Sequence, residues 1–148
     1  MLLEDLFAGR AIDLPQMLKH MKGVAAQEGL PFGDRKKTFN SRRAQELAKW
    51  AESKGQGDVF HDAVFRAYFV DGKNISKTGN LVELAESLRL SGKEARVVLK
   101  TGAYREAVDQ DWMRSRRLGV TAVPTFLWGQ KFVVGAQPYE VLANFVSP

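Results

Sequence analysis

The sequence predicts a mixed α/β fold that is mostly helical and ends in a small β-hairpin. Apolar residues recur every three or four positions in most segments between residues 13 and 118, which is the period of amphipathic helices. Two β-branched and aromatic runs follow, Thr121–Trp128 and Lys131–Gly135, and the Gly129-Gln130 pair between them suits a two-residue hairpin loop. Because 148 residues suffice for one hydrophobic core, we expect a single domain over residues 1–148.

Capping residues mark the ends of several predicted helices. Asp13 precedes an amphipathic segment that stops before Gly29. Ser91 precedes a shorter one, and Gly102 follows it. A longer helix is predicted from Tyr104 to the Leu118-Gly119 pair, after which the hydrophobic period changes from helical to strand-like. A last helix is expected to begin at Pro138.

Residues 58–69 are predicted to form the central helix of the core. They include several large apolar side chains, too many for a helix with a solvated face: Phe60, Val64, Phe65, Tyr68 and Phe69. The preceding helix, capped by Asn40 or Ser41, is expected to bury a face of Ala44, Leu47, Ala48 and Ala51. Asn80, with Glu83 three residues later, resembles a capping box and is expected to open a further helix.

The composition excludes several kinds of chemistry. The chain has no cysteine, which removes disulfides, thiolate nucleophiles and most structural zinc sites. The two histidines, His20 and His61, do not lie at ligand spacing, so we expect neither a metal nor a cofactor. Four serines lie at predicted caps or helix surfaces without a base at motif spacing, and we assign no catalytic residue to this group: Ser41, Ser53, Ser76 and Ser87.

The charge pattern is that of a globular protein with a solvated basic surface. The net charge is +5, but 17 acidic residues are interspersed and no aromatic residues alternate with the basic clusters, so nucleic acid is not the expected partner. No run approaches the roughly 20 apolar residues of a transmembrane helix, and we expect no membrane partner. The acidic Glu4-Asp5 start differs from a basic secretory signal, which favours a cytoplasmic location.

The most informative motif is Gly119–Phe126, with the sequence Gly-Val-Thr-Ala-Val-Pro-Thr-Phe. It places Pro124 at the start of a predicted strand, where proline cannot donate a ladder hydrogen bond. From spacing alone, a trans proline on an edge strand is the expected arrangement. The alternative is a cis Val123–Pro124 bond, which would leave the backbone of Val123 free to pair with an extended chain.

This motif, followed by Gly135–Glu140, resembles the C-terminal half of DsbA-like thioredoxin-fold proteins, most closely the FrnE-like branch. Asn40–Ala44 resembles the start of a helix in that branch, and Val64–Phe69 with Asn74-Ile75 resembles part of its helical insertion. The resemblance extends over about residues 6–146 in the order of the family. Several separate segments therefore support it together.

The resemblance implies a truncated thioredoxin-like (DsbA-like) fold. A helical insertion would occupy about residues 10–118, and residues 119–148 would form the C-terminal part of the thioredoxin fold, with a β-hairpin, a helix and a cis Val123–Pro124 bond. Family members begin with a strand, a Cys-x-x-Cys helix start and a second strand, and this sequence shows no counterpart of them. We therefore expect either a truncated protein or a remnant of one.

The resemblance also implies a function in thiol–disulfide exchange. In the family the first cysteine is the nucleophile, and the cis-proline strand faces it and guides the substrate chain. Val123, Pro124 and Thr125 would accordingly bind an extended peptide or protein substrate. Without a thiolate the chain would be inactive alone as a protein-disulfide oxidoreductase.

Two alternatives remain open. The chain could be a non-catalytic binding or self-assembling module, a homodimer for example, because the edges of the predicted hairpin can pair with another strand. A less favoured kinship is with the glutathione-dependent kappa-class transferases and the 2-hydroxychromene-2-carboxylate isomerases. Those families share the helical insertion and cis-proline, but their catalytic serine belongs to an N-terminal region without a counterpart here.

Overall fold

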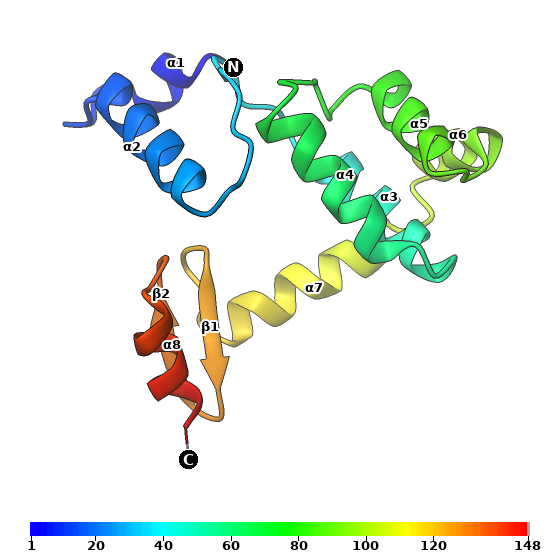
Figure 1. The fold of residues 1–148 in the computed structure, drawn as a ribbon. Helices are drawn as coiled ribbons and strands as arrows, with labels where there is room; N and C mark the ends of the chain where they lie inside the picture. The colour runs from blue at the N-terminus through cyan, green and yellow to red at the C-terminus, as the bar shows by residue number, and fades with distance from the viewer. Residues whose placement is uncertain (148) are drawn as a thin grey trace. The chain divides into compact units, whose positions relative to one another are not determined.

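The computed structural model describes residues 1–147, which form eight helices and two strands (Figure 1). The chain divides into two compact units, Met1–Val108 and Asp109–Pro148. The division falls within α7 (Arg105–Arg117), whereas the sequence suggested a boundary at the end of that helix. The two units are described one at a time below.

The first unit is built from helices. Besides the start of α7 it contains six helices: α1 (Leu3–Phe7), α2 (Leu14–Gln27), α3 (Arg42–Ser53), α4 (Gly57–Phe69), α5 (Thr78–Ser87) and α6 (Gly92–Thr101). Helix α1 was not predicted from the sequence. Leu2 forms an isolated antiparallel bridge with Lys37, which connects the segment before α1 to the loop between α2 and α3.

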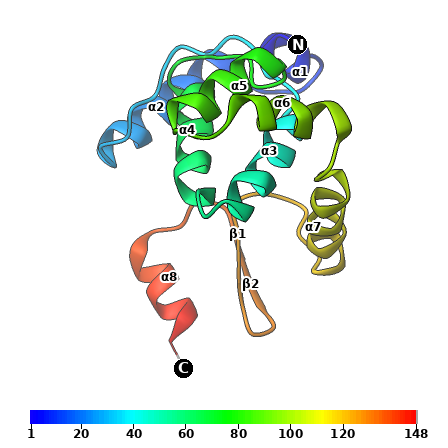
Figure 2. The same ribbon diagram turned by 90° about the vertical axis from the view of Figure 1, so that its right-hand side faces the viewer.

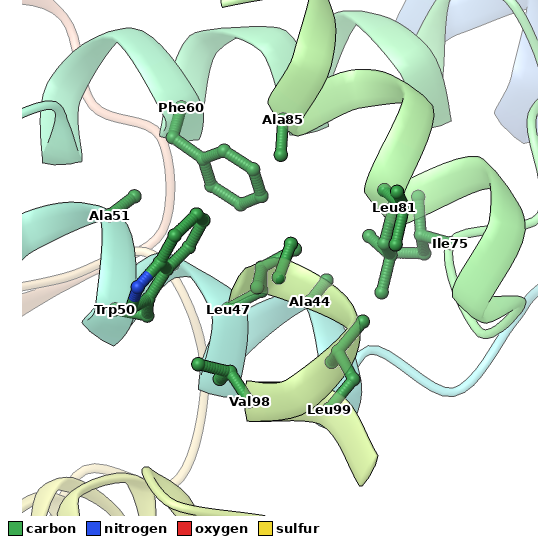
Figure 3. Close-up of a cluster of buried hydrophobic side chains, with 13 residues drawn as sticks. Ala44, Leu47, Trp50, Ala51, Phe60, Ile75, Leu81, Ala85, Val98 and Leu99 are labelled. Atoms are coloured by element: carbon green, nitrogen blue, oxygen red, sulfur yellow. The ribbon is translucent and has the colours of Figure 1, made fainter. Parts of the chain in front are cut away.

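Helix α3, not α4, lies at the centre of this unit. It packs against α4, α5 and α6 and buries six residues: Ala44, Glu46, Leu47, Ala48, Trp50 and Ala51. Side chains from all four helices point toward one another in the core (Figure 3). The prediction of a central helix at residues 58–69 is therefore wrong. Helix α4 buries Phe60 and Ala67, while Phe65 is 57% exposed because no other helix covers that face.

Several predicted caps are confirmed. The Asp13 carboxylate accepts a hydrogen bond from the Gln16 amide at 3.0 Å, and Ser91 Oγ accepts one from the Glu94 amide at 3.2 Å. Gly102 ends α6 with a φ of 68°. The predicted capping role of Asn80 is wrong. Helix α5 already begins at Thr78, and the Asn80 side chain donates to the Asn74 carbonyl at 3.0 Å.

The loop between α2 and α3 is attached directly to the end of α4. The Gly33 amide donates to the Phe69 carbonyl at 2.9 Å. A Cβ atom at position 33 would lie only 2.0 Å from the Val70 carbonyl oxygen, so any larger residue would displace the backbone. Glycine is required here by this close approach of two backbone segments.

The second unit contains the predicted hairpin. Strands β1 (Thr125–Trp128) and β2 (Lys131–Val134) run antiparallel and side by side in both views, and α8 (Tyr139–Val146) follows them (Figures 1 and 2). Trp128 pairs with Lys131, which leaves a two-residue loop. The first of these, Gly129, has a φ of 61°, as a type II′ turn requires. Strand β1 starts four residues later than the predicted Thr121.

The second unit has no buried side chain of its own. Within Asp109–Ser147, every residue is at least partly exposed. Exposed apolar side chains lie on β1, β2 and α8, and they include Trp128, Phe132 and Tyr139. The second unit therefore has no hydrophobic core of its own among the described residues. None of the helices in residues 1–147 is long and apolar enough to cross a membrane.

Candidate functional site

A helix-terminating turn directs the chain toward the predicted site. At the end of α7, Gly119 has a φ of 74° and its amide donates to the Arg116 carbonyl at 3.0 Å. The Val120 amide donates to the Ser115 carbonyl, also at 3.0 Å. These two bonds make a Schellman motif, in which a glycine with left-handed backbone ends the helix. The prediction that this helix stops at Leu118-Gly119 is confirmed.

The hairpin holds two of the three predicted site residues. The Pro124 carbonyl accepts a hydrogen bond from the Gly135 amide at 2.8 Å, just beyond the last pair of the ladder. Thr125 is the first residue of β1, and its Oγ1 donates to the Ala122 carbonyl at 2.6 Å. The Val123–Pro124 peptide bond is cis. Pro124 and Thr125 are thus fixed by local backbone contacts.

Val123, the third predicted site residue, is free of such contacts. It is 87% exposed, more than any other large apolar side chain among residues 1–147. Within the same residues, neither its amide nor its carbonyl has a hydrogen-bond partner. One backbone donor and one acceptor therefore lie on the surface directly before a strand. This is the arrangement that an extended peptide needs in order to pair with the chain.

A shallow depression of about 340 Å³ adjoins Val123. Its walls come from α7 and from residues 120–123, and Trp112 and Arg116 are the largest side chains that line it. These two residues were not predicted to belong to the site, because nothing in their spacing relates them to the later motif. The depression can accept a side chain of a peptide that pairs with Val123.

The site contains no cysteine thiol. Among residues 1–147, no three His, Asp or Glu side chains lie close enough together to hold a metal ion. Three of the serines that the sequence analysis considered bond to nearby acceptors: Ser53 Oγ to the Trp50 carbonyl, Ser76 Oγ to Asn74 Oδ1, and Ser87 Oγ to the Leu84 carbonyl. The unpaired backbone groups of Val123 suit binding of the main chain of an extended peptide.

Ion pairs shift two pKa values, both in the first unit. Lys22 donates a hydrogen bond to Asp34 and lowers the pKa of that carboxyl. The Glu94 carboxylate lies 2.7 Å from Lys54 Nζ and raises the pKa of that ammonium group. Both pairs are on the surface, where such interactions contribute little to stability. Val123, Pro124 and Thr125 carry no titratable group.

One family model and several known proteins match this chain. The family model for the DSBA-like thioredoxin domain matches residues 8–147. A probable DsbA oxidoreductase from Streptomyces coelicolor superposes with a TM-score of 0.86 at 29% identity, over 97% of this chain and 64% of that one. A 2-hydroxychromene-2-carboxylate isomerase superposes with a TM-score of 0.74, over 90% of this chain and 67% of that one. Its 21% identity establishes a shared fold alone.

Two further relatives are more distant in structure or cover less of the chain. The cytosolic disulfide reductase DsbM from Pseudomonas aeruginosa, in a structure with GSH, superposes with a TM-score of 0.62 at 25% identity, over 82% of this chain and 66% of that one. The uncharacterized protein YwbO from Bacillus subtilis is 29% identical over 99 residues, which are 66% of this chain. The chain spans 50% of YwbO and 64% of the Streptomyces protein.

The predicted DsbA-like thioredoxin fold is confirmed by these matches, which agree with the mostly helical architecture and the two-stranded antiparallel sheet. The family match covers almost the whole sequence, including both units. The chain therefore belongs to the DSBA-like thioredoxin domain family.

Proposed function

We propose that this chain forms the substrate-facing part of a DsbA-like protein-disulfide oxidoreductase of the FrnE-like branch. The single observation that carries the proposal is the exposed Val123, whose amide and carbonyl are unpaired next to β1. An extended substrate would pair with this backbone, while Pro124 and Thr125 hold the strand in place. A side chain of the substrate would enter the depression beside Val123.

The redox step requires thiols that this sequence does not contain. Thiol–disulfide exchange begins with attack by a thiolate, and the 148 residues include no cysteine. In this proposal the chain binds and orients the substrate. A Cys-x-x-Cys motif outside these 148 residues contributes the nucleophile. The substrate is a protein or peptide with a cysteine or a disulfide in an extended stretch.

The purified 148-residue chain is expected to show no dithiol oxidase or reductase activity, because it has no thiolate. The measurements are reduction of insulin by dithiothreitol and oxidation of a dithiol peptide, each compared with buffer. Adding a separate polypeptide with the strand and Cys-x-x-Cys helix of the family is expected to produce activity. Turnover by the chain alone would contradict the proposal that the thiol of the redox step lies outside these 148 residues.

The absence of cysteine allows a direct test of the binding site. In the Val123→Cys variant the new thiol is the only one, and it can attack a peptide cysteine that carries a thionitrobenzoate group. The peptide–thionitrobenzoate disulfide breaks, a protein–peptide disulfide forms, and coloured thionitrobenzoate leaves with the electron pair. If the peptide binds beside position 123, the higher effective concentration should speed this reaction by about tenfold or more.

The matched control is Val97→Cys on α6, because Val97 is 53% exposed and lies in the first unit. Each rate is divided by the rate of the same variant with a small aromatic disulfide, which removes differences in intrinsic thiol reactivity. If the normalised rates of Val123→Cys and Val97→Cys are about equal, peptide binding at Val123 is contradicted.

A second candidate function is a non-catalytic module that assembles with itself or with another protein. It is favoured by the second unit, in which both outer strand edges are unpaired among residues 1–147 and no residue is buried. We expect concentration-dependent dimers in sedimentation velocity at micromolar concentration. Trp128→Asp, which places a charge on this exposed apolar surface, should weaken them. A strict monomer would contradict self-assembly.

A cytoplasmic location is part of the same proposal. The support is the likeness to the cytosolic disulfide reductase from Pseudomonas aeruginosa. Fractionation of cells that produce the protein from its own gene, followed by immunoblotting, tests this location. Recovery with periplasmic or secreted markers would contradict it.

A further inference from the structure

We propose that a pocket between α3 and α4 binds a small planar aromatic anion, separately from the proposed peptide site. The pocket has a volume of about 400 Å³ and lies wholly within the unit Met1–Val108. Sites for small molecules commonly have volumes of about 300–1,000 Å³ and combine apolar walls with a few polar groups. This pocket has both properties.

Aromatic rings form one wall of the pocket. Phe65 stacks on Phe69 with ring centroids 6.0 Å apart and an interplanar angle of 19°, and Tyr68 meets Phe69 edge-on at 4.8 Å. Phe39 contacts Tyr68 at 6.3 Å in a T-shaped arrangement. Because Phe65 is 57% exposed, its ring remains accessible to another flat ring. An aromatic ligand would extend this cluster.

Two hydroxyl groups give the pocket a polar end. Thr38 Oγ1 and Tyr68 OH lie 3.1 Å apart, and both residues line the pocket. The two hydroxyls carry two protons, and only one can lie between the oxygens. The second proton has no acceptor among residues 1–147, so it can be donated to an oxygen of the ligand. A carboxylate or phenolate oxygen is the strongest acceptor for it.

The charge around the pocket favours an anion. None of its lining residues is acidic. His61 lines it and lies 3.8 Å from Glu52 Oε1. Arg35 does not line the pocket, but its guanidinium carbon is 4.4 Å from the centre of the Tyr68 ring and 5.0 Å from that of Phe69, two residues that do. Arg35 Nε is buried without a hydrogen-bond partner in the described residues, and no carboxylate there pairs with this side chain. The adjacent Asp34 is paired with Lys22.

The two isoleucines of the chain provide a site-specific measurement. Ile75 lines the pocket and is buried, whereas Ile12 is exposed and lies elsewhere. With selective ¹³C labelling of the isoleucine δ1 methyl groups, the full chain gives two signals. Titration with 2-naphthoate should shift the Ile75 signal to saturation, with a dissociation constant below about 1 mM, and leave Ile12 unchanged. No shift of Ile75, or equal unsaturable shifts of both signals, would overturn the proposal.

Ligand controls separate the aromatic and anionic requirements. Cyclohexanecarboxylate keeps the charge and lacks the flat ring, and 2-naphthalenemethanol keeps the ring and lacks the charge. Each should bind at least about fivefold more weakly than 2-naphthoate. Equal affinity for the neutral alcohol would overturn the assignment of an anion, and equal affinity for the cyclohexane compound would overturn that of an aromatic ring.

Protein variants locate the binding. Phe65→Ala removes the exposed ring and should raise the dissociation constant about tenfold, whereas Val59→Ala on the same helix should not change it, because Val59 is exposed and does not line the pocket. Tyr68→Phe keeps the ring and removes the hydroxyl, and it should weaken binding severalfold. If Phe65→Ala does not fold, the Tyr68→Phe variant serves as the test. Unchanged affinity in the folded variants would overturn the proposal.

Discussion

Phe60→Ala is expected to lower the free energy of unfolding by about 3–5 kcal/mol, the usual range for loss of a buried phenylalanine. Phe60 is fully buried and points from α4 toward α3 and α5 in the core (Figure 3). Removing the ring leaves a cavity that the surrounding helices cannot fill without moving. Urea unfolding followed by far-ultraviolet circular dichroism measures the loss, because helices dominate that signal.

Phe65→Ala is the matched control on the same helix. Its ring is 57% exposed, so the same substitution should change the free energy of unfolding by about 1 kcal/mol or less. The pair of variants has the same chemistry and differs only in burial. Similar losses for both would mean that Phe60 does not lie in the core as described.

Glu46→Ala is expected to lower the free energy of unfolding by about 1.5–3 kcal/mol, the range for losing a hydrogen bond between charged groups. Glu46 is only 5% exposed, and its Oε1 accepts a hydrogen bond from Arg42 Nε at 3.0 Å. Arg42 Nη2 also donates to the Arg105 carbonyl at 2.8 Å, which attaches α3 to the start of α7. Without Glu46, Arg42 Nε loses this acceptor.

The control for this prediction is Glu52→Ala, which removes a carboxylate from the same helix. Glu52 pairs with Lys49, and its side chain is 45% exposed, so the expected change is within about 0.5–1 kcal/mol. Glu46→Gln keeps an acceptor for Arg42 and should cause a smaller loss than Glu46→Ala. If Glu46→Ala and Glu52→Ala have the same free energy of unfolding, the Arg42–Glu46 pair does not stabilise the fold as inferred.

Local features of the fold could be predicted where the determining residues are adjacent in sequence. Asp13 and Ser91 cap helices because a short polar side chain can reach an amide three residues later. Gly119 ends α7 because it adopts a left-handed backbone, and Gly129 forms the hairpin turn for the same reason. These interactions need no partner from a distant part of the chain.

Features that depend on distant neighbours could not be predicted. The apolar residues of α4 have the spacing of a core helix, but burial depends on which faces α3 and α5 cover. Glu46 looks like a surface residue in sequence, and only the position of Arg42 and the surrounding helices explains its burial. Asn80 matches a capping pattern, yet its side chain bonds to the Asn74 carbonyl in the preceding turn.

The candidate site was predicted in part. The motif around Pro124 singled out this segment as a candidate, because a proline at the start of a strand is unusual and the resemblance gave it a role. The sequence could not reveal that Val123 has no backbone partner, since this depends on where the hairpin ladder stops. Nor could it place Trp112 beside that residue, because a helix end and a turn intervene.

The bond between Gly33 and the end of α4 makes one amide a reporter of loop motion. The Gly33 amide can exchange its proton with solvent only after its bond to the Phe69 carbonyl breaks. Local opening that exposes this amide therefore has to separate the loop from the end of α4. Hydrogen exchange at this single glycine would report the free energy of that opening.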